Sequence, residues 1–234
     1  MKNRFYGDIN DYIKYGILDI LSNEYKSLGI NWYLTDDKHG NQKHGNKTRY
    51  LDDDKWKNYH PRIFSLLKSR LKKQQRDISY CGTDSVINFK CEFCDQLPDN
   101  ATRNNYSQLR NQWHTKAVGH FKECDLMFFD PDIGITDQSS RGPVKNSEYC
   151  LATELEDYSW CDWLVVQFLQ RRRRYDQLRA NPILNVAKRR DKKVMVFIYS
   201  QMALLYASDK IRSSVMHSIF QRWDTRVDTK VLVP

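Results

Sequence analysis

The chain lacks any long apolar segment. No run of apolar residues approaches the roughly 18 residues that suggest a membrane-spanning helix. The first residues, MKNRFYGDINDY, also lack the apolar centre of a secretory signal peptide. These two absences predict a soluble, cytoplasmic protein with no membrane partner.

The chain also lacks linkers and repeats. No stretch rich in glycine, proline or serine divides the 234 residues, and no segment is repeated. A chain of this length can bury a core without disulfides or metals. Strand-like and helix-like patterns alternate along it, which is typical of an α/β domain. We predict a single domain over residues 1–234, with an insertion near residues 85–115. Its expected fold is a doubly wound, mostly parallel, Rossmann-like sheet with helices on both faces.

Metal-binding cysteine patterns are incomplete. Several of the six cysteines lie in strand-like apolar settings, and without a secretory signal they are expected to be free, buried thiols. Cys91 and Cys94 have the spacing of a zinc knuckle, but no second Cys-x-x-Cys or His pair lies near them. A structural zinc normally takes four ligands, so a metal at this pair is left open.

Positive charge is in excess. The sequence holds 38 Lys and Arg against 29 Asp and Glu, a formal net charge of +9. Such a balance favours polyanionic partners. Fourteen tyrosines and six tryptophans would provide stacking surfaces if the partner has unpaired bases, although the core also uses such residues. We therefore expect a nucleic acid, RNA or DNA, as the partner.

Short apolar runs mark the expected strands. Runs that suit burial on both faces of a sheet occur at Ile30–Leu34, Ile78–Cys81, Leu126–Phe129, Trp163–Phe168 and Val194–Tyr199. An alternating pattern at Arg226–Val233 predicts a final edge strand. Helices are expected within residues 5–28, 50–73, 108–121, 170–178 and 201–220. The first has Asp8 or Asn10 as its cap and Gly29 as its stop.

The segment Cys124–Ile135 contains the best candidate site. Its apolar run ends in Asp130-Pro131-Asp132, where the proline cannot donate to a strand ladder. Two carboxylates therefore follow a buried strand at its carboxyl end, which is where open α/β sheets bind ligands. We predict Asp130 and Asp132 as catalytic residues. The alternative is a turn with no chemistry.

A polar loop follows the first expected strand. Residues 35–45 contain Asp36, Asp37, His39 and Gly40 at the place where a Rossmann sheet has its first ligand-binding loop. The loop has no G-x-G-x-x-G motif, so a phosphate cradle is not supported. A surface loop without a ligand is an equal alternative.

Four consecutive arginines follow another expected strand, Trp163–Leu169. Sheet ends and helix starts both collect anions, and arginine binds phosphate well. The run therefore predicts a nucleic-acid-binding segment made of Arg171, Arg172, Arg173 and Arg174. The alternative is a solvated charge run.

Three segments, in the same order along the chain, resemble the RlmJ-type ribosomal RNA adenine-N6 methyltransferases. The segment Phe5–Tyr15, FYGDINDYIKY, resembles the F-H-A-G-N-x-x-D-x-x-K-H run of that family. Residues 32–45 are similar to its first strand and D-x-H-x-G loop, and Phe129–Asp132 stands in the place of its I-D-P-P-Y motif. In this chain, Asp132 and Ile133 replace the second proline and the aromatic residue that would stack on a flipped base.

The resemblance implies a class I fold that uses S-adenosylmethionine. Asp11 and Lys14 would lie beside the cofactor, and Asp130 would accept a hydrogen bond from the target amino group. The cofactor's amino-acid end would bind the loop that contains Asp36, Asp37, His39 and Gly40. An exocyclic amine that attacks a methyl sulfonium needs orientation and an acceptor more than a strong base. The implied activity is methylation of a base amino group.

Two other functions remain open. In a metal-dependent nuclease or phosphodiester hydrolase, Asp130, Asp132 and Asp36 would hold Mg²⁺ or Mn²⁺ while the Arg171–Arg174 run binds phosphate. In a non-catalytic nucleic-acid-binding protein, the same fold would keep the basic surface without the chemistry.

Overall fold

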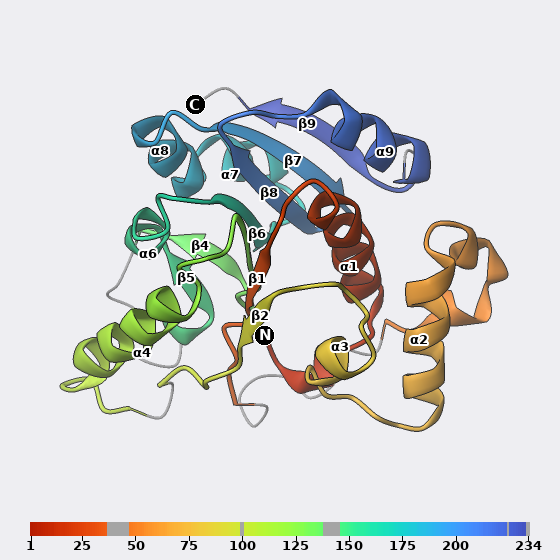
Figure 1. Cartoon of the computed structure of the whole chain (residues 1–234), viewed down its shortest axis with the longest axis horizontal. Helices are drawn as coiled ribbons and strands as arrows, with labels where there is room; N and C mark the ends of the chain where they lie inside the picture. The colour runs from red at the N-terminus through yellow and green to blue at the C-terminus, as the bar shows by residue number, and fades with distance from the viewer. Residues whose placement is uncertain (37–46, 99–100, 138–145, 224, 233–234) are drawn as a thin grey trace.

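A seven-stranded sheet forms the centre of the chain in a computed structural model that describes residues 1–36, 47–98, 101–137, 146–223 and 225–232 (Figure 1). The strand order is β2-β1-β3-β6-β8-β7-β9. The strands β2, β1, β3 and β6 are parallel, whereas β8 is antiparallel to both of its neighbours and β9 is antiparallel to β7. The fold is therefore mixed α/β with a mostly parallel central sheet. The bounds are β1 Leu28–Asn31, β2 Cys91–Phe93, β3 Leu126–Phe129, β6 Asp162–Phe168, β7 Lys193–Tyr199, β8 Met202–Ser208 and β9 Asp228–Leu232.

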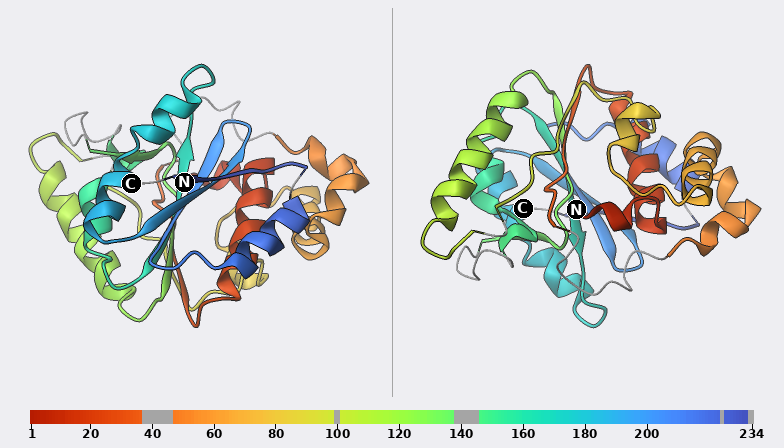
Figure 2. Two further views of the ribbon diagram at one scale, coloured as in Figure 1. Left: turned by 90° about the horizontal axis from the view of Figure 1, so that it is seen from above. Right: turned by 90° about the horizontal axis from the view of Figure 1, so that it is seen from below.

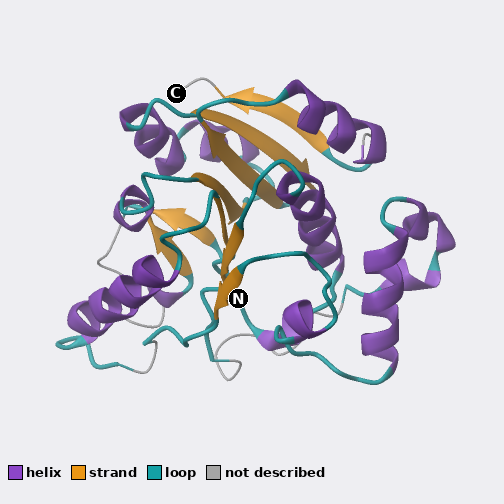
Figure 3. Ribbon diagram, in the orientation of Figure 1, coloured by secondary structure: helices purple, strands orange, loops and turns teal. Residues whose placement is uncertain are grey.

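Helices cover both faces of this sheet (Figures 1 and 2). One face carries α1 Ile9–Ser22, α2 Pro61–Lys72, α3 Tyr80–Thr83 and α9 Ser213–Trp223, and the other carries α4 Tyr106–His120, α6 Ala152–Glu156, α7 Arg174–Arg179 and α8 Pro182–Arg189. Short 3₁₀ helices occur at η1 Asn3–Phe5, η2 Arg49–Asp52 and η3 Asp54–Asn58. A small parallel pair, β4 Gly134–Thr136 and β5 Tyr149–Leu151, lies beside the main sheet (Figure 3).

The core is divided into two layers by the sheet. Successive residues of β3 point to opposite faces, so Leu126 and Phe128 pack in one apolar cluster and Met127 and Phe129 in the other. All four are fully buried, as the apolar run predicted. Within the described residues, no helix combines the length and apolar character needed to cross a membrane.

Most of the expected strands are confirmed. Leu126–Phe129, Trp163–Phe168 and Val194–Tyr199 all form strands, and the edge strand expected within Arg226–Val233 is β9. The first strand is placed earlier than predicted, because β1 ends at Asn31 rather than Leu34. The predicted stop at Gly29 is wrong, since α1 ends at Ser22 and Gly29 lies within β1.

The strand predicted at Ile78–Cys81 is wrong. This segment is a turn that leads into α3, and Ile78 and Cys81 are both buried in the same cluster. Residues three apart share a face in a helical turn but face opposite sides in a strand, so the spacing suits the turn. The edge of the sheet is formed instead by β2, which lies within the region predicted as an insertion.

The helix predicted over residues 201–220 is wrong in its first half. Residues 202–208 form β8, which returns from β7 through a tight turn with Ser200 at a φ of 53°. Every residue of β8 is buried, and an apolar run of that kind does not distinguish a strand from a buried helix. Only α9, from Ser213, is helical in this range.

Two glycines in helices provide a test of the packing. A Cβ on Gly16 of α1 would lie 2.4 Å from Cζ2 of the buried Trp223 in α9, whereas a Cβ on Gly119 of α4 would meet nothing within 4 Å. Overpacking typically costs about 1–3 kcal/mol. Alanine is more favourable than glycine in a helix by about 1 kcal/mol. We expect Gly16→Ala to lower the free energy of unfolding and Gly119→Ala to raise it, both measured by urea denaturation. Equal stabilisation by the two changes would contradict the α1–α9 contact.

Candidate active site at the β1–β3 switch point

The order of the strands changes direction between β1 and β3. The chain proceeds from β1 to β2 on one side, and β3 then pairs with the opposite side of β1. The carboxyl ends of the two strands are adjacent, because Asn31 pairs with Phe129 in register. Ligands of open α/β sheets bind at such a switch point, outside the carboxyl ends of the strands. Asp130 directly follows β3 at this place.

Asp130 forms a buried cluster with two residues of α1. Its side chain is 2% exposed, and Lys14 Nζ lies 2.8 Å from Oδ2 and 3.1 Å from Oδ1. The same ammonium lies 2.7 Å from Asp11 Oδ1. Asp11 Oδ2 accepts hydrogen bonds from the Gly7 amide and the Tyr15 hydroxyl. The fold therefore brings Asp130, selected from the end of a buried strand, together with the pair Asp11 and Lys14 of the N-terminal segment.

The start of α1 positions this cluster. Asp8 caps the helix by accepting from the backbone amides of Asn10 and Asp11, as expected of a cap. Burial and repulsion from Asp11 raise the pKa of Asp8 to about 7. The capped first turn places Asp11 and Lys14 three residues apart on one face, directed at the end of β3.

Burial and ion pairing oppose one another in the cluster. Burial raises the pKa of Asp130 despite the opposing effects of Lys14 and the amino group of Met1. Burial alone would lower the pKa of Lys14, but Asp11 and Asp130 outweigh it and the pKa is raised. Lys14 is therefore a firmly charged ammonium shared by two carboxylates. When both carboxylates are ionised, the cluster has one negative charge in excess, a property that favours an additional cation.

Asp132 belongs to a separate network. Its carboxylate accepts a hydrogen bond of 2.8 Å from Thr35 Oγ1, forms an ion pair with Lys2, and lies 3.0 Å from the amino group of Met1. That amino group also donates to the carbonyl of Tyr33, and Met1 and Lys2 are themselves buried. Burial alone would raise the pKa of Asp132, but the two ammonium groups lower it to about 2. The first residues of the chain thus lie across the ends of β1 and β3.

The predicted metal ligands do not assemble. Asp130 is ion-paired with Lys14, whereas Asp132 is ion-paired with Lys2 and the amino group of Met1. Among the described residues, no group of three or more His, Cys, Asp or Glu side chains is placed to hold a metal ion. Cys91 and Cys94 do not change this finding, because Cys94 is exposed and the sulfur of Cys91 contacts Cys124. The predicted cofactor residues Asp37, His39 and Gly40 lie outside the described residues.

The arginine run lies on the same edge of the sheet as Asp130. Arg171, Arg172 and Arg173 are exposed in the turn after β6, and Arg174 begins α7 and lies 3.1 Å from Asp228 of β9. The end of the run is therefore close to the start of β9, which is the last strand in the order of the sheet and lies farthest from β2 and β1.

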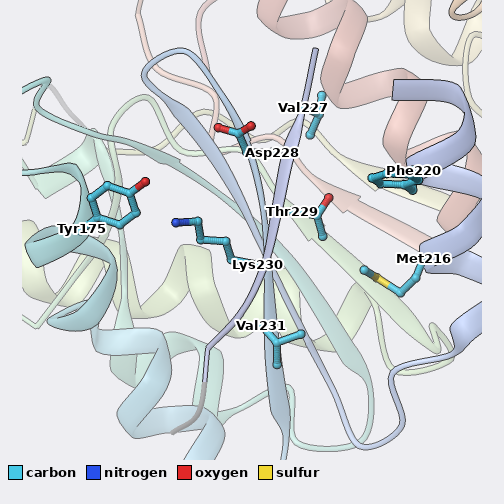
Figure 4. Close-up of a pocket in the computed structure, with 8 residues that line it drawn as sticks. All are labelled: Tyr175, Met216, Phe220, Val227, Asp228, Thr229, Lys230 and Val231. Atoms are coloured by element: carbon cyan, nitrogen blue, oxygen red, sulfur yellow. The ribbon is translucent and has the colours of Figure 1, made fainter. Parts of the chain in front are cut away.

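A groove of about 570 Å³ lies along β9 beside this run (Figure 4). The Lys230 ammonium lies 4.0 Å from the centre of the Tyr175 ring, a cation–π contact. Phe220 and Met216 of α9 line the other side of β9 (Figure 4). Tyr175 and Phe220 are both more than half exposed, so the groove offers accessible aromatic faces beside one cation, Lys230, and one carboxylate, Asp228.

Sequence reasoning missed several members of these sites. Lys2 forms an ion pair with Asp132, and Thr35 donates a hydrogen bond to it. Neither residue belongs to a sequence motif that indicates a functional role. Lys230 lies in the alternating segment 226–233, where alternation indicates that one set of side chains is exposed, but its approach to Tyr175 depends on how β9 and α7 pack.

The Asp132 network predicts a dependence of stability on pH. A folded-state pKa of about 2, below the ordinary 3.8, means that the unfolded chain binds the proton first as the pH falls. The ion pairs therefore stabilise the fold fully above about pH 5 and lose their effect towards pH 2, a contribution of about 2 kcal/mol. We expect Asp132→Asn and Lys2→Met to lower the urea midpoint at pH 7, and the deficit of each to shrink below pH 4. A deficit that stays constant down to pH 3 would contradict the Asp132 network.

Comparison with known proteins adds no further identification. No protein-family model, curated protein or solved structure matches the chain. The comparisons therefore neither support nor oppose the resemblance to the RlmJ-type methyltransferases.

Proposed function

We propose that this chain is a class I methyltransferase-like protein that acts on nucleic acid and methylates a base amino group with S-adenosylmethionine. The contact between Lys14 and Asp130 carries the proposal, because it joins two of the three resembling segments across 116 residues of sequence. The third resembling segment, residues 32–45, contacts the segment after β3 because the Thr35 hydroxyl donates a hydrogen bond to Asp132. A doubly wound, Rossmann-like sheet is part of the proposal, supported by helices on both faces and by the switch between β1 and β3.

The charges of the cluster suit this cofactor. S-adenosylmethionine, when bound, supplies a methyl group on a positively charged sulfonium. Asp11 and Asp130 share one ammonium, so their excess negative charge favours such a cation near them. In the proposal, Asp11 and Lys14 line the cofactor side of the switch point.

Asp130 has the role of acceptor in this proposal. Its carboxylate would accept a hydrogen bond from the amino group of the base and orient that group for attack. One of its oxygens would remain with Lys14, which keeps the carboxylate in place. Because the reaction needs orientation more than a strong base, a carboxylate already held by an ammonium is adequate.

The basic edge provides the contact with nucleic acid. Arg171, Arg172 and Arg173 are exposed and free to contact phosphates, while the neighbouring groove offers the faces of Tyr175 and Phe220 to unpaired bases. This combination also supports a non-catalytic nucleic-acid-binding protein, which the cofactor experiment separates from a methyltransferase.

The cofactor experiment measures melting temperature with S-adenosylmethionine and with its demethylated product. A ligand at 100 times its Kd stabilises the native state by about 2.7 kcal/mol. For a chain of this size that corresponds to a rise of about 5–10 °C. We expect Asp130→Asn to reduce this rise, measured against the variant's own melting temperature. Asp191→Asn, an exposed change before β7, is the matched control and should keep the full rise.

No thermal shift and no calorimetric heat with saturating cofactor would reject the methyltransferase proposal. In that case Mg²⁺ and Mn²⁺ form the next arm of the experiment. A thermal shift with either ion that is lost in both Asp130→Asn and Asp132→Asn would instead support the metal-dependent hydrolase. No shift with any of these ligands, combined with retained nucleic-acid binding, would identify a binding protein on the same fold.

The nucleic-acid experiment compares two basic runs. Arg171–Arg173 lie at the carboxyl edge of the sheet, whereas Lys188–Arg190 are equally basic and exposed but end α8 at the amino edge. Glutamines in place of the first run should weaken binding to a mixed-sequence oligonucleotide. The slope of log K against log salt should become shallower by about 0.7–0.9 per lost phosphate contact. Glutamines in the second run remove the same charge and should leave the slope nearly unchanged. Equal effects of the two sets would mean that only net charge matters.

A further inference from the structure

Two free thiols meet at the amino end of the sheet, opposite the candidate active site. Cys91 is the first residue of β2, and Cys124 lies two residues before β3. Their sulfur atoms are 3.3 Å apart although 33 residues separate them in the sequence. Both cysteines are free. The sulfurs are therefore close enough for a covalent bond to form after a small movement.

Gly29 of β1 makes this approach possible. The strand β1 lies between β2 and β3, and Gly29 pairs with Cys91 on one side and with Met127 on the other. A Cβ at Gly29 would lie 2.8 Å from the sulfur of Cys124 and 2.6 Å from that of Met127. The missing side chain thus leaves the space over β1 in which the two thiols meet.

Neighbouring contacts hold the two segments in place. Lys90 and Glu123, the residues directly before the two cysteines, form an ion pair. The backbone amide of Lys90 donates to the carbonyl of Leu28, and that of Cys124 donates to the carbonyl of Phe121. These contacts restrain the backbone on either side of the thiol pair.

The two thiols differ in access. Cys91 is partly exposed, whereas Cys124 is 1% exposed and its pKa is raised to about 12 by burial and by its neighbour Cys91. A reagent in solution therefore reaches Cys91 first. We propose that Cys91 and Cys124 are a reversible disulfide site that exchanges with low-molecular-weight disulfides.

The exchange proceeds in two balanced steps. The Cys91 thiolate attacks one sulfur of oxidised glutathione, forms a mixed disulfide and releases one glutathione thiolate. The Cys124 thiolate then attacks the Cys91 sulfur of that mixed disulfide and releases the second glutathione. Two protein thiols become one disulfide, oxidised glutathione becomes two reduced molecules, and the two thiol protons pass to these leaving groups. Reduced glutathione or dithiothreitol reverses both steps.

The bond would lock the edge of the sheet. The strand β2 has only three residues and pairs with β1 alone among the described strands, so its end is a place where the sheet can open. A disulfide from Cys91 to Cys124 closes a loop of about 33 residues and restricts the unfolded chain. Because the pair lies at the amino ends of the strands, the consequence is for stability and is independent of the proposed methyltransferase function.

The test equilibrates the native 234-residue chain with oxidised and reduced glutathione at several ratios. Peptide mapping without reduction should find the Cys91 and Cys124 peptides joined, with no glutathione retained. The melting temperature should rise by about 5–10 °C and return on addition of dithiothreitol. Cys94→Ser, three residues from Cys91 and exposed, is the matched control and should leave both results unchanged.

Cys91→Ser should abolish the joined peptides and the thermal shift. This side chain is partly exposed, so the variant is expected to fold, and circular dichroism of the reduced form checks that it does. A joined pair of Cys91 and Cys94, or glutathione adducts alone in the native protein, would overturn the proposal. Joined Cys91 and Cys124 peptides with no rise in melting temperature would overturn the stabilising role.

Discussion

The buried ammonium of Lys14 between Asp11 and Asp130 is the contact on which the centre of the structure depends. Each of these charges has lost its water, at a cost of several kcal/mol that only the partners can offset. Removing one partner of such a buried pair typically costs about 3–5 kcal/mol, because an uncompensated charge remains. The cluster therefore fixes α1 over the end of β3 and determines which side chains face the switch point.

The Asp-Pro-Asp segment divides its two carboxylates between two networks. Asp130 pairs with Lys14 from α1, whereas Asp132 pairs with Lys2 and the amino group of Met1. Proline between them restricts the backbone. Two carboxylates that are each ion-paired with different partners differ from a metal site, which needs several oxygens directed at one point. This division is the physical reason for preferring an acceptor role for Asp130 over metal binding.

The two edges of the sheet have different chemistry. At the carboxyl edge lie the buried ion pairs and the exposed arginines after β6, and the aromatic groove extends from there along β9. At the amino edge lie the thiol pair of Cys91 and Cys124 and its flanking ion pair. Parallel strands produce this separation, because all their carboxyl ends meet at one edge and all their amino ends at the other. The proposed ligand site and the proposed disulfide site therefore lie at opposite edges of the same sheet.

The sequence by itself determined the buried strands whose apolar runs are short and bounded, such as Leu126–Phe129. It also marked Asp130 through the strand that precedes it, and the pair Asp11 and Lys14 through the resemblance of the N-terminal segment. It did not distinguish the strand at Met202–Ser208 from a helix, because a run buried on all sides has no period to measure. Tertiary structure alone decided the partners. Lys14 meets Asp130 across 116 residues, Lys2 meets Asp132 across 130, and Cys91 meets Cys124 over a glycine in a third segment. Such contacts depend on the order of strands in the sheet, which local patterns do not encode.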